Sequence, residues 1–157
     1  MRKTSYPLIL VLALLVSAGT VLTPNIALAG GNAQDSVVNR ITTKELVKIL
    51  KEDGYSADLD KDGDIIWKLE GYNALVLTPN DNSIEFYIAF AESKATMARI
   101  NDWNMNRRYS RSYMDQKKQA CLELDLDLEG GVTRDRIRDF LKTCRESFVT
   151  WYKEVLM

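Results

Sequence analysis

Alternating hydrophobic and polar residues between positions 55 and 128 predict a series of β-strands, each with one apolar face and one polar face. The clearest case is 122–128, in which leucines alternate with Glu123, Asp125 and Asp127. A Lys-Asp-Gly turn at 61–63 predicts a β-hairpin, because glycine tolerates the positive φ that such turns need. The predicted strands span 55–60, 64–70, 73–78, 83–91, 109–114 and 122–128.

Hydrophobic residues spaced three or four apart predict three helices, at about 43–53, 93–106 and 133–155. Thr42 followed by Glu45 has the spacing of a capping box, which marks the start of the first helix. In the second helix the expected buried stripe is Met97, Ile100 and Trp103. In the third helix it is Ile137, Leu141, Cys144, Phe148, Tyr152 and Val155.

These one-sided elements predict an α+β fold. Each strong strand has one apolar face and each helix has one apolar stripe, so the economical packing lays the helices over one face of an antiparallel sheet. The opposite face of the sheet is then open to solvent, a ligand or a second copy of the chain.

The first 29 residues have the organisation of a secretory signal peptide. Arg2 and Lys3 precede an apolar run over 8–22, and small residues before Gly30 supply a cleavage site after Ala29. The apolar run is shorter than the roughly 20 residues that span a bilayer as a helix. We therefore expect a periplasmic or secreted protein that carries no membrane segment once the leader is removed.

Cleavage would leave 128 of the 157 residues (157 minus 29), the usual size of one domain. We expect a short flexible lead-in over 30–40 and a single domain over 41–157. The chain has 21 basic and 22 acidic residues, and the leader removes two basic ones, so the remainder carries a net charge near −3. This balance argues against nucleic-acid binding.

Histidine is absent from the whole chain. Its absence excludes Ser-His-Asp and Cys-His catalysis and any metal site with a histidine ligand. We expect no cofactor and no enzymatic activity. The alternative is a small hydrolase that uses the carboxylates of Glu123, Asp125 and Asp127, which should project about 7 Å apart from one side of a strand.

The segment from Asp58 to Asp64 resembles the start of a calcium loop. Asp58, Asp60, Asp62 and Asp64 place oxygen donors at alternate positions. An EF-hand needs a glutamate at its twelfth position, where this chain has Leu69. The segment is interpreted as an acidic hairpin tip, with weak calcium binding as the alternative.

Two cysteines, Cys121 and Cys144, would remain in an oxidising compartment, which makes a disulfide between them conceivable. The alternation of the strand places Cys121 on the side away from the helices, whereas Cys144 lies on the helix stripe that packs on the sheet. The two thiols should face apart, so the Cys121–Cys144 bridge is disfavoured.

Several motifs in the second half of the chain resemble the YbjN domain family. Trp103-Asn104 lies in a predicted helix and Arg108-Tyr109 opens a predicted strand, and an acidic leucine strand then runs into a Gly-Gly turn before the long final helix. The likeness spans about 41–155. The residues that carry it include Trp103, Asn104, Arg108, Tyr109, Leu124, Asp125, Gly130 and Gly131.

The resemblance implies a fold similar to that of type III secretion chaperones, with helices on one face of an antiparallel sheet. Family members are described as sensory-transduction regulators without an established biochemical activity, so the resemblance supplies no catalytic residues. It suggests partner binding or dimerisation. The predicted leader is a departure, because the chaperones of similar fold work in the cytosol.

The sequence therefore predicts an exported, non-enzymatic binding or regulatory domain. It should engage a protein partner, or a second copy of itself, through the exposed sheet face or a helix groove. The carboxylate hydrolase and the weak calcium-binding module are the competing hypotheses.

Overall fold

The structure is a computed structural model, and it describes residues 36–157. The predicted signal peptide and the first part of the predicted lead-in lie outside the described residues. The described residues belong to one compact unit.

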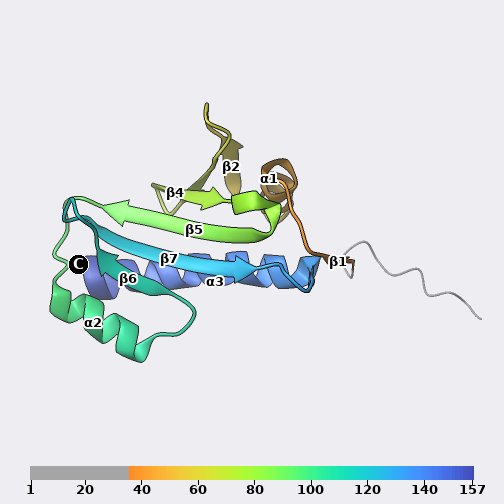
Figure 1. The fold of residues 1–157 in the computed structure, drawn as a ribbon. Helices are drawn as coiled ribbons and strands as arrows, with labels where there is room; N and C mark the ends of the chain where they lie inside the picture. The colour runs from red at the N-terminus through yellow and green to blue at the C-terminus, as the bar shows by residue number, and fades with distance from the viewer. Residues whose placement is uncertain (1–35) are drawn as a thin grey trace, which may run out of the picture. The chain divides into compact units, whose positions relative to one another are not determined.

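A six-stranded antiparallel sheet forms the centre of this unit, in the order β2-β3-β4-β5-β7-β6 (Figure 1). Its strands are β2 (Ser56–Leu59), β3 (Ile65–Leu69), β4 (Tyr72–Leu77), β5 (Ser83–Phe90), β6 (Arg111–Met114) and β7 (Ala120–Asp127). The helical elements are α1 (Thr43–Glu52), α2 (Met97–Asn106), α3 (Arg134–Trp151), a 3₁₀ turn η2 (Pro79–Asp81) and a closing π-helical turn η3 (Tyr152–Leu156). β1 (Val37–Val38) and β8 (Val132–Thr133) form a separate two-stranded ladder.

Threonine caps set the starts of the helices. At α1 the Thr42 hydroxyl accepts the Glu45 N–H at 3.3 Å, and the Glu45 carboxylate accepts the Thr42 N–H at 3.0 Å. This confirms the predicted capping box, which satisfies two backbone donors that a helix leaves unpaired. Thr96 and Thr133 cap α2 and α3 through the hydroxyl alone, which accepts the N–H of Arg99 and of Arg136.

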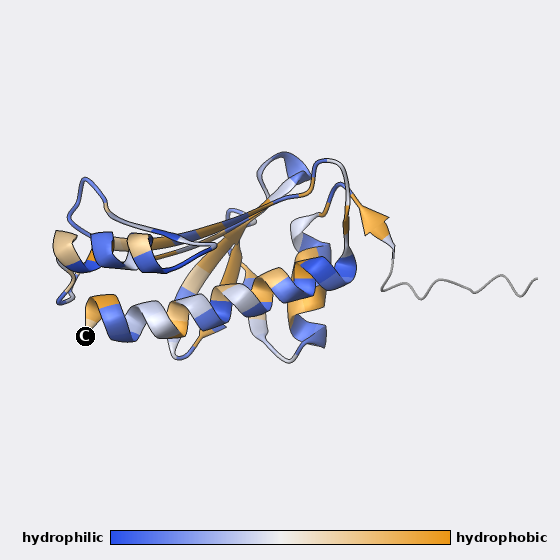
Figure 2. Cartoon of the chain, turned by 90° about the horizontal axis from the view of Figure 1, so that it is seen from below, coloured by the Kyte–Doolittle hydropathy of each residue, from blue (hydrophilic) through white to orange (hydrophobic). Residues whose placement is uncertain are grey.

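The hydrophobic core lies between one face of the sheet and the helices. The alternation of the strands places every second side chain on this face, where it is buried. Hydrophobic and hydrophilic residues alternate along α1 and α3, which is the pattern of helices that cover a core on one side (Figure 2). The predicted α+β fold is therefore confirmed. The larger core residues include Leu46, Leu50, Ile65, Trp67, Phe86, Leu124, Leu141, Phe148 and Trp151.

α2 adds a feature that the sequence pattern does not reveal, since it packs against the edge strand β6. The side-chain amide of Asn104 donates to the Ser112 carbonyl at 2.8 Å and accepts the Ser112 N–H at 2.9 Å. The Trp103 indole donates to the Ser110 hydroxyl at 3.1 Å, and the Trp151 indole donates to the Ser112 hydroxyl at 2.8 Å. These bonds satisfy the outer backbone groups of β6 at Ser112 and attach α2 to the sheet.

The start of α2 differs from the prediction. The helix begins at Met97 rather than at 93, because Thr96 supplies the cap. Met97 is therefore the first helical residue, and its side chain is 64 % exposed instead of joining the buried stripe of Ile100 and Trp103.

Two residues of the predicted lead-in over 30–40 belong to a short β-ladder, which was not predicted from the sequence. Val37 pairs with Thr133 and Val38 pairs with Val132, and Ile41 is buried in the core. The β-branched valines suit a ladder. Gly131, which lacks a Cβ atom, lets Val37 approach closely.

The predicted strand 109–114 begins later, at Arg111. The reason is Tyr109, whose φ of 67° lies in the left-handed region and cannot continue an extended strand. The Tyr109 side chain is 75 % exposed.

Candidate interaction surface

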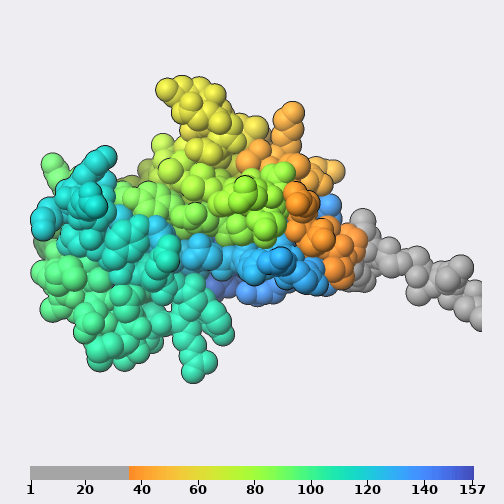
Figure 3. Space-filling view, viewed as in Figure 1, coloured from red at the N-terminus to blue at the C-terminus, as the bar shows by residue number. Residues whose placement is uncertain are grey.

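The face of the sheet opposite the core carries a row of side chains across five strands. Strand register places Ile66 beside Leu75, Leu75 beside Tyr87, Tyr87 beside Glu123, and Glu123 beside Arg111. We call this set the cross-strand row. β5 and β7 lie at the surface in the view of Figure 3. Ile66, Leu75 and Tyr87 are half-buried, so part of the apolar area on this face meets solvent.

Glu123 is the buried charge of this face. It is 5 % exposed, accepts a hydrogen bond from the Tyr113 hydroxyl and forms an ion pair with Arg111. Burial and the bond to Glu123 raise the pKa of Tyr113, and the bond to Glu123 raises the pKa of Arg111. Two donors therefore compensate the Glu123 carboxylate, which is the usual requirement for a buried charge.

Glu85 lies beside this pair on the same face and has a raised pKa. Burial is the main cause, and the carboxylates of Glu123 and Asp125 add to it. A raised folded pKa means that ionisation of Glu85 opposes folding.

We expect Glu85→Gln to raise the free energy of unfolding at pH 7 by about 0.5 kcal/mol, the size of effect usual for a partly exposed charge. Below the pKa that Glu85 has in the unfolded chain, the side chain is protonated in both states and does not oppose folding. As the pH rises through the higher pKa of the folded state, Glu85 ionises and this stability is lost. The gain from glutamine should therefore vanish near pH 3. Urea unfolding at both pH values measures it, with Glu92→Gln on an exposed loop as control. An equal gain at pH 3 would contradict this assignment.

The two cysteines are both free and buried. Cys121 lies on the cross-strand side, where its sulfur is 3.5 Å from the Tyr87 hydroxyl, whereas Cys144 lies on α3 in the core. The sheet thus separates the two thiols. Burial raises the pKa of both, which keeps them in the unreactive thiol form.

The three carboxylates of the hydrolase hypothesis do not share a cavity. Asp125 lines a cavity of about 300 Å³, which neither Glu123 nor Asp127 lines. Glu123 is paired with Arg111, whereas Asp125 and Asp127 are exposed. The geometry brings no acid and base together around one substrate position.

The acidic hairpin tip is held by its own hydrogen bonds. The Asp60 carboxylate accepts the backbone N–H of Asp62 at 2.9 Å and of Asp64 at 3.0 Å, and Asp58 pairs with Lys51 at 2.9 Å. No group of three or more metal-ligating side chains is assembled within residues 36–157.

We expect millimolar calcium to leave the melting temperature unchanged relative to a chelator, because these carboxylates do not converge on one point. Differential scanning fluorimetry with and without calcium measures this. A ligand that binds only the folded protein raises its melting temperature. An increase of more than about 2 °C with calcium would therefore support the calcium hypothesis.

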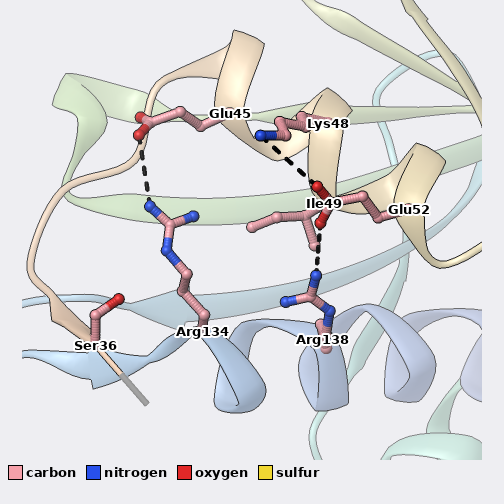
Figure 4. Close-up of a pocket in the computed structure, with 7 residues that line it drawn as sticks. All are labelled: Ser36, Glu45, Lys48, Ile49, Glu52, Arg134 and Arg138. Atoms are coloured by element: carbon pink, nitrogen blue, oxygen red, sulfur yellow. Dashed lines mark hydrogen bonds and ion pairs between the residues drawn. The ribbon is translucent and has the colours of Figure 1, made fainter. Parts of the chain in front are cut away.

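A cavity of about 490 Å³ lies between α1 and α3 (Figure 4). Each of its cations already has a carboxylate partner: Arg134 lies 3.7 Å from Glu45, Arg138 lies 2.7 Å from Glu52, and Lys48 lies 3.8 Å from the same glutamate. Arg138 also lies 2.9 Å from Asp53, so the charges of this helix groove are engaged in ion pairs within the chain. The cross-strand row is therefore the stronger candidate surface.

A comparison with protein families decides the relationship. The model of YbjN, described as "Putative bacterial sensory transduction regulator", matches residues 42–157. The chain belongs to the YbjN family. The match covers every element from α1 to η3 and, of the described elements, leaves only β1 outside it. No curated protein sequence matches the chain.

Two solved structures share this fold. One is YbjN from E. coli, a "putative transcription regulator", with a TM-score of 0.58 and 15 % identity over 78 % of this chain and 99 % of that one. The other is the Yersinia pestis type III secretion chaperone SycH in complex with a fragment of YscM2, with a TM-score of 0.51 and 12 % identity over 69 % of this chain and 98 % of that one. At such identities the likeness concerns the fold. None of the helices within residues 36–157 is long and apolar enough to cross a bilayer.

The residues that resemble the YbjN family do not form one site. Trp103 and Asn104 attach α2 to β6, as described above. Arg108 and Tyr109 are exposed between these elements, Leu124 is in the core and Asp125 is exposed on the opposite face. Gly130 and Gly131 make a turn with φ of 82° and 90°.

Sequence reasoning missed that Glu123 is a buried, paired carboxylate. The strand pattern placed it among solvent-facing acids. A hint was available, because Arg111 and Tyr113 also alternate along a predicted strand and could face it. The pairing of β6 with β7 shows that Arg111 and Tyr113 lie on the same face as Glu123.

Proposed function

We propose that this YbjN-family chain is an exported, non-enzymatic binding domain that engages a protein partner through the uncovered sheet face. The observation that carries the proposal is the cross-strand row, with Ile66, Leu75 and Tyr87 half-buried next to the Arg111–Glu123 pair. Apolar centres bordered by charged groups are common in protein interfaces.

The family and the fold support this reading. A family of regulators and a chaperone neighbour are non-enzymatic kinds of protein. The crystal structure of SycH holds it in complex with a fragment of another protein, YscM2. For the present chain we infer a protein partner by analogy in fold, together with the apolar character of the uncovered face.

Substitution within the row tests the proposal. Leu75→Glu places a charge in the middle of the surface and should reduce capture of the partner in crosslinked cell-envelope extracts at least tenfold. Met97→Glu is the matched control, since it adds the same charge at an exposed hydrophobic residue on α2. Thermal melts establish that both variants are folded.

Equal capture by wild type, Leu75→Glu and Met97→Glu would overturn the assignment to this face. Sedimentation of the purified protein over a range of concentrations distinguishes the homodimer. A protein that is monomeric throughout, and captures nothing, would contradict the binding function as a whole.

Export is a separate part of the proposal and rests on the order of basic, apolar and small residues in 1–29. Mass spectrometry of the protein from cell fractions should find a chain that begins at Gly30 in the periplasm or the medium. An intact chain with its leader, found in the cytoplasm alone, would contradict export.

A further inference from the structure

The edge strand β6 is only half as long as its neighbour β7. β6 pairs with residues 120–123, whereas β7 continues to Asp127. Within the described chain, 36–157, no strand pairs with the outer edge of 124–127. We call residues 124–127 the free edge of β7.

The pairing of β6 shows which backbone groups this edge presents. The N–H and C=O of Ser112 bond to Asn104, so they point away from β7. The pair that exchanges backbone bonds is therefore Arg111 with Glu123. Because the alternation continues along β7, the N–H and C=O of Asp125 and Asp127 point outward from the free edge.

The free edge exists because the chain turns away before β6. Tyr109, with φ of 67°, would lie opposite Asp125 if β6 were longer. The Trp103–Ser110 hydrogen bond holds the turn in place. The backbone groups of Ser112 that point away from β7 are already bonded by Asn104.

A cavity of about 300 Å³ adjoins the free edge. Asp125 and Tyr109 line one side, and four residues of α3 line the other: Arg136, Asp139, Phe140 and Thr143. Arg136 and Asp139 form an ion pair at 2.9 Å, so the α3 side adds no net charge. An added strand would direct alternate side chains toward α3 and into this space, and the remaining side chains toward the uncovered face.

Charge favours one kind of occupant. Asp125 and Asp127 project on the uncovered face, next to Glu85. A second copy paired antiparallel about Leu126 would place Asp125 directly opposite Asp127 of the other copy, and such like-charge pairs are destabilising. A strand with cations at alternate positions would instead neutralise these carboxylates.

We propose that the free edge of β7 accepts an extended peptide segment with Lys or Arg at alternate positions, as an added antiparallel strand. This inference rests on the proposed binding function. It names the chemistry of the partner and a contact beyond the cross-strand row.

Nuclear magnetic resonance of the purified protein tests the proposal with the peptide acetyl-Lys-Val-Lys-Val-Lys-Val-amide. The amides of Asp125 and Asp127 should exchange at least tenfold more slowly in its presence, while the Asp58 amide on the opposite edge strand should be unaffected. The glutamate analogue of the peptide, and an analogue with N-methyl groups at alternate residues, should bind at least tenfold more weakly.

The variant Asp125→Asn/Asp127→Asn should weaken binding of the lysine peptide at least tenfold. The asparagine at 127 can still accept the Glu129 N–H that Asp127 accepts at 2.8 Å. Asp62→Asn removes the same kind of charge at the β2–β3 turn and should bind as wild type does.

Absence of protection at millimolar peptide, or equal binding of the N-methylated analogue, would overturn strand addition. Equal binding of the glutamate analogue would overturn the charge preference. The Leu75→Glu experiment tests the uncovered face, whereas the peptide experiment tests the free edge. If the peptide does not bind but Leu75→Glu still reduces capture of the partner, only the inference about the free edge is refuted.

Discussion

Replacing Asn104 with alanine should lower the free energy of unfolding by about 2–3 kcal/mol, because it leaves both outer backbone groups of Ser112 without a partner. An alanine cannot replace either bond. α2 should also lose its attachment to β6, so amide exchange in α2 should accelerate. Denaturant unfolding and hydrogen exchange measure the two effects.

Asn101→Ala is the matched control on the same helix. Asn101 is exposed and its side-chain amide contacts only the Met105 sulfur, at 3.3 Å. The substitution should change stability by less than about 0.5 kcal/mol. If Asn101→Ala and Asn104→Ala lower the free energy of unfolding by similar amounts, the bonds between Asn104 and Ser112 do not stabilise the fold as proposed.

Gly131→Ala should destabilise the protein by about 2–3 kcal/mol. The φ of 90° alone costs an alanine about 1–2 kcal/mol. A Cβ atom at this position would also lie 2.5 Å from Cγ1 of Val37, so β1 would have to shift from β8. Thermal or denaturant unfolding measures the loss.

Gly63→Ala separates the two causes of this loss. Gly63 has the same φ of 90°, but nothing lies within 4 Å of a Cβ atom built there. Gly63→Ala should therefore lower stability only by the cost of a positive φ for alanine. Val37→Ala combined with Gly131→Ala should recover the excess, and a double variant no better than Gly131→Ala would contradict the contact with Val37.

Alternation along the chain was sufficient to predict most of the fold. The leucines of 122–128 predicted a one-sided strand, and the stripe of 137–155 predicted a helix over it. The strand is observed as β7, and the helix is observed as α3 followed by the π-helical turn η3, which contains Tyr152 and Val155. Hydrophobic residues that recur at every second position, or at every third or fourth position, reflect which side chains are buried. These patterns can therefore be read from the sequence without other information.

The interaction surface could be predicted only in outline. The open face follows from the pattern, but the Arg111–Glu123 pair and the Asn104–Ser112 bonds depend on which strands become neighbours. The free edge arises from the left-handed backbone conformation of Tyr109. This conformation could not be predicted, because tyrosine usually avoids a positive φ.

The most direct test of the binding function is photo-crosslinking in the living cell from two positions. A photoreactive residue at Leu75, in the cross-strand row, should give a covalent adduct with a specific protein. The same residue at Lys142, exposed on the far side of the sheet on α3, should give none. Adducts from Lys142 but not from Leu75, or none from either position, would contradict the account.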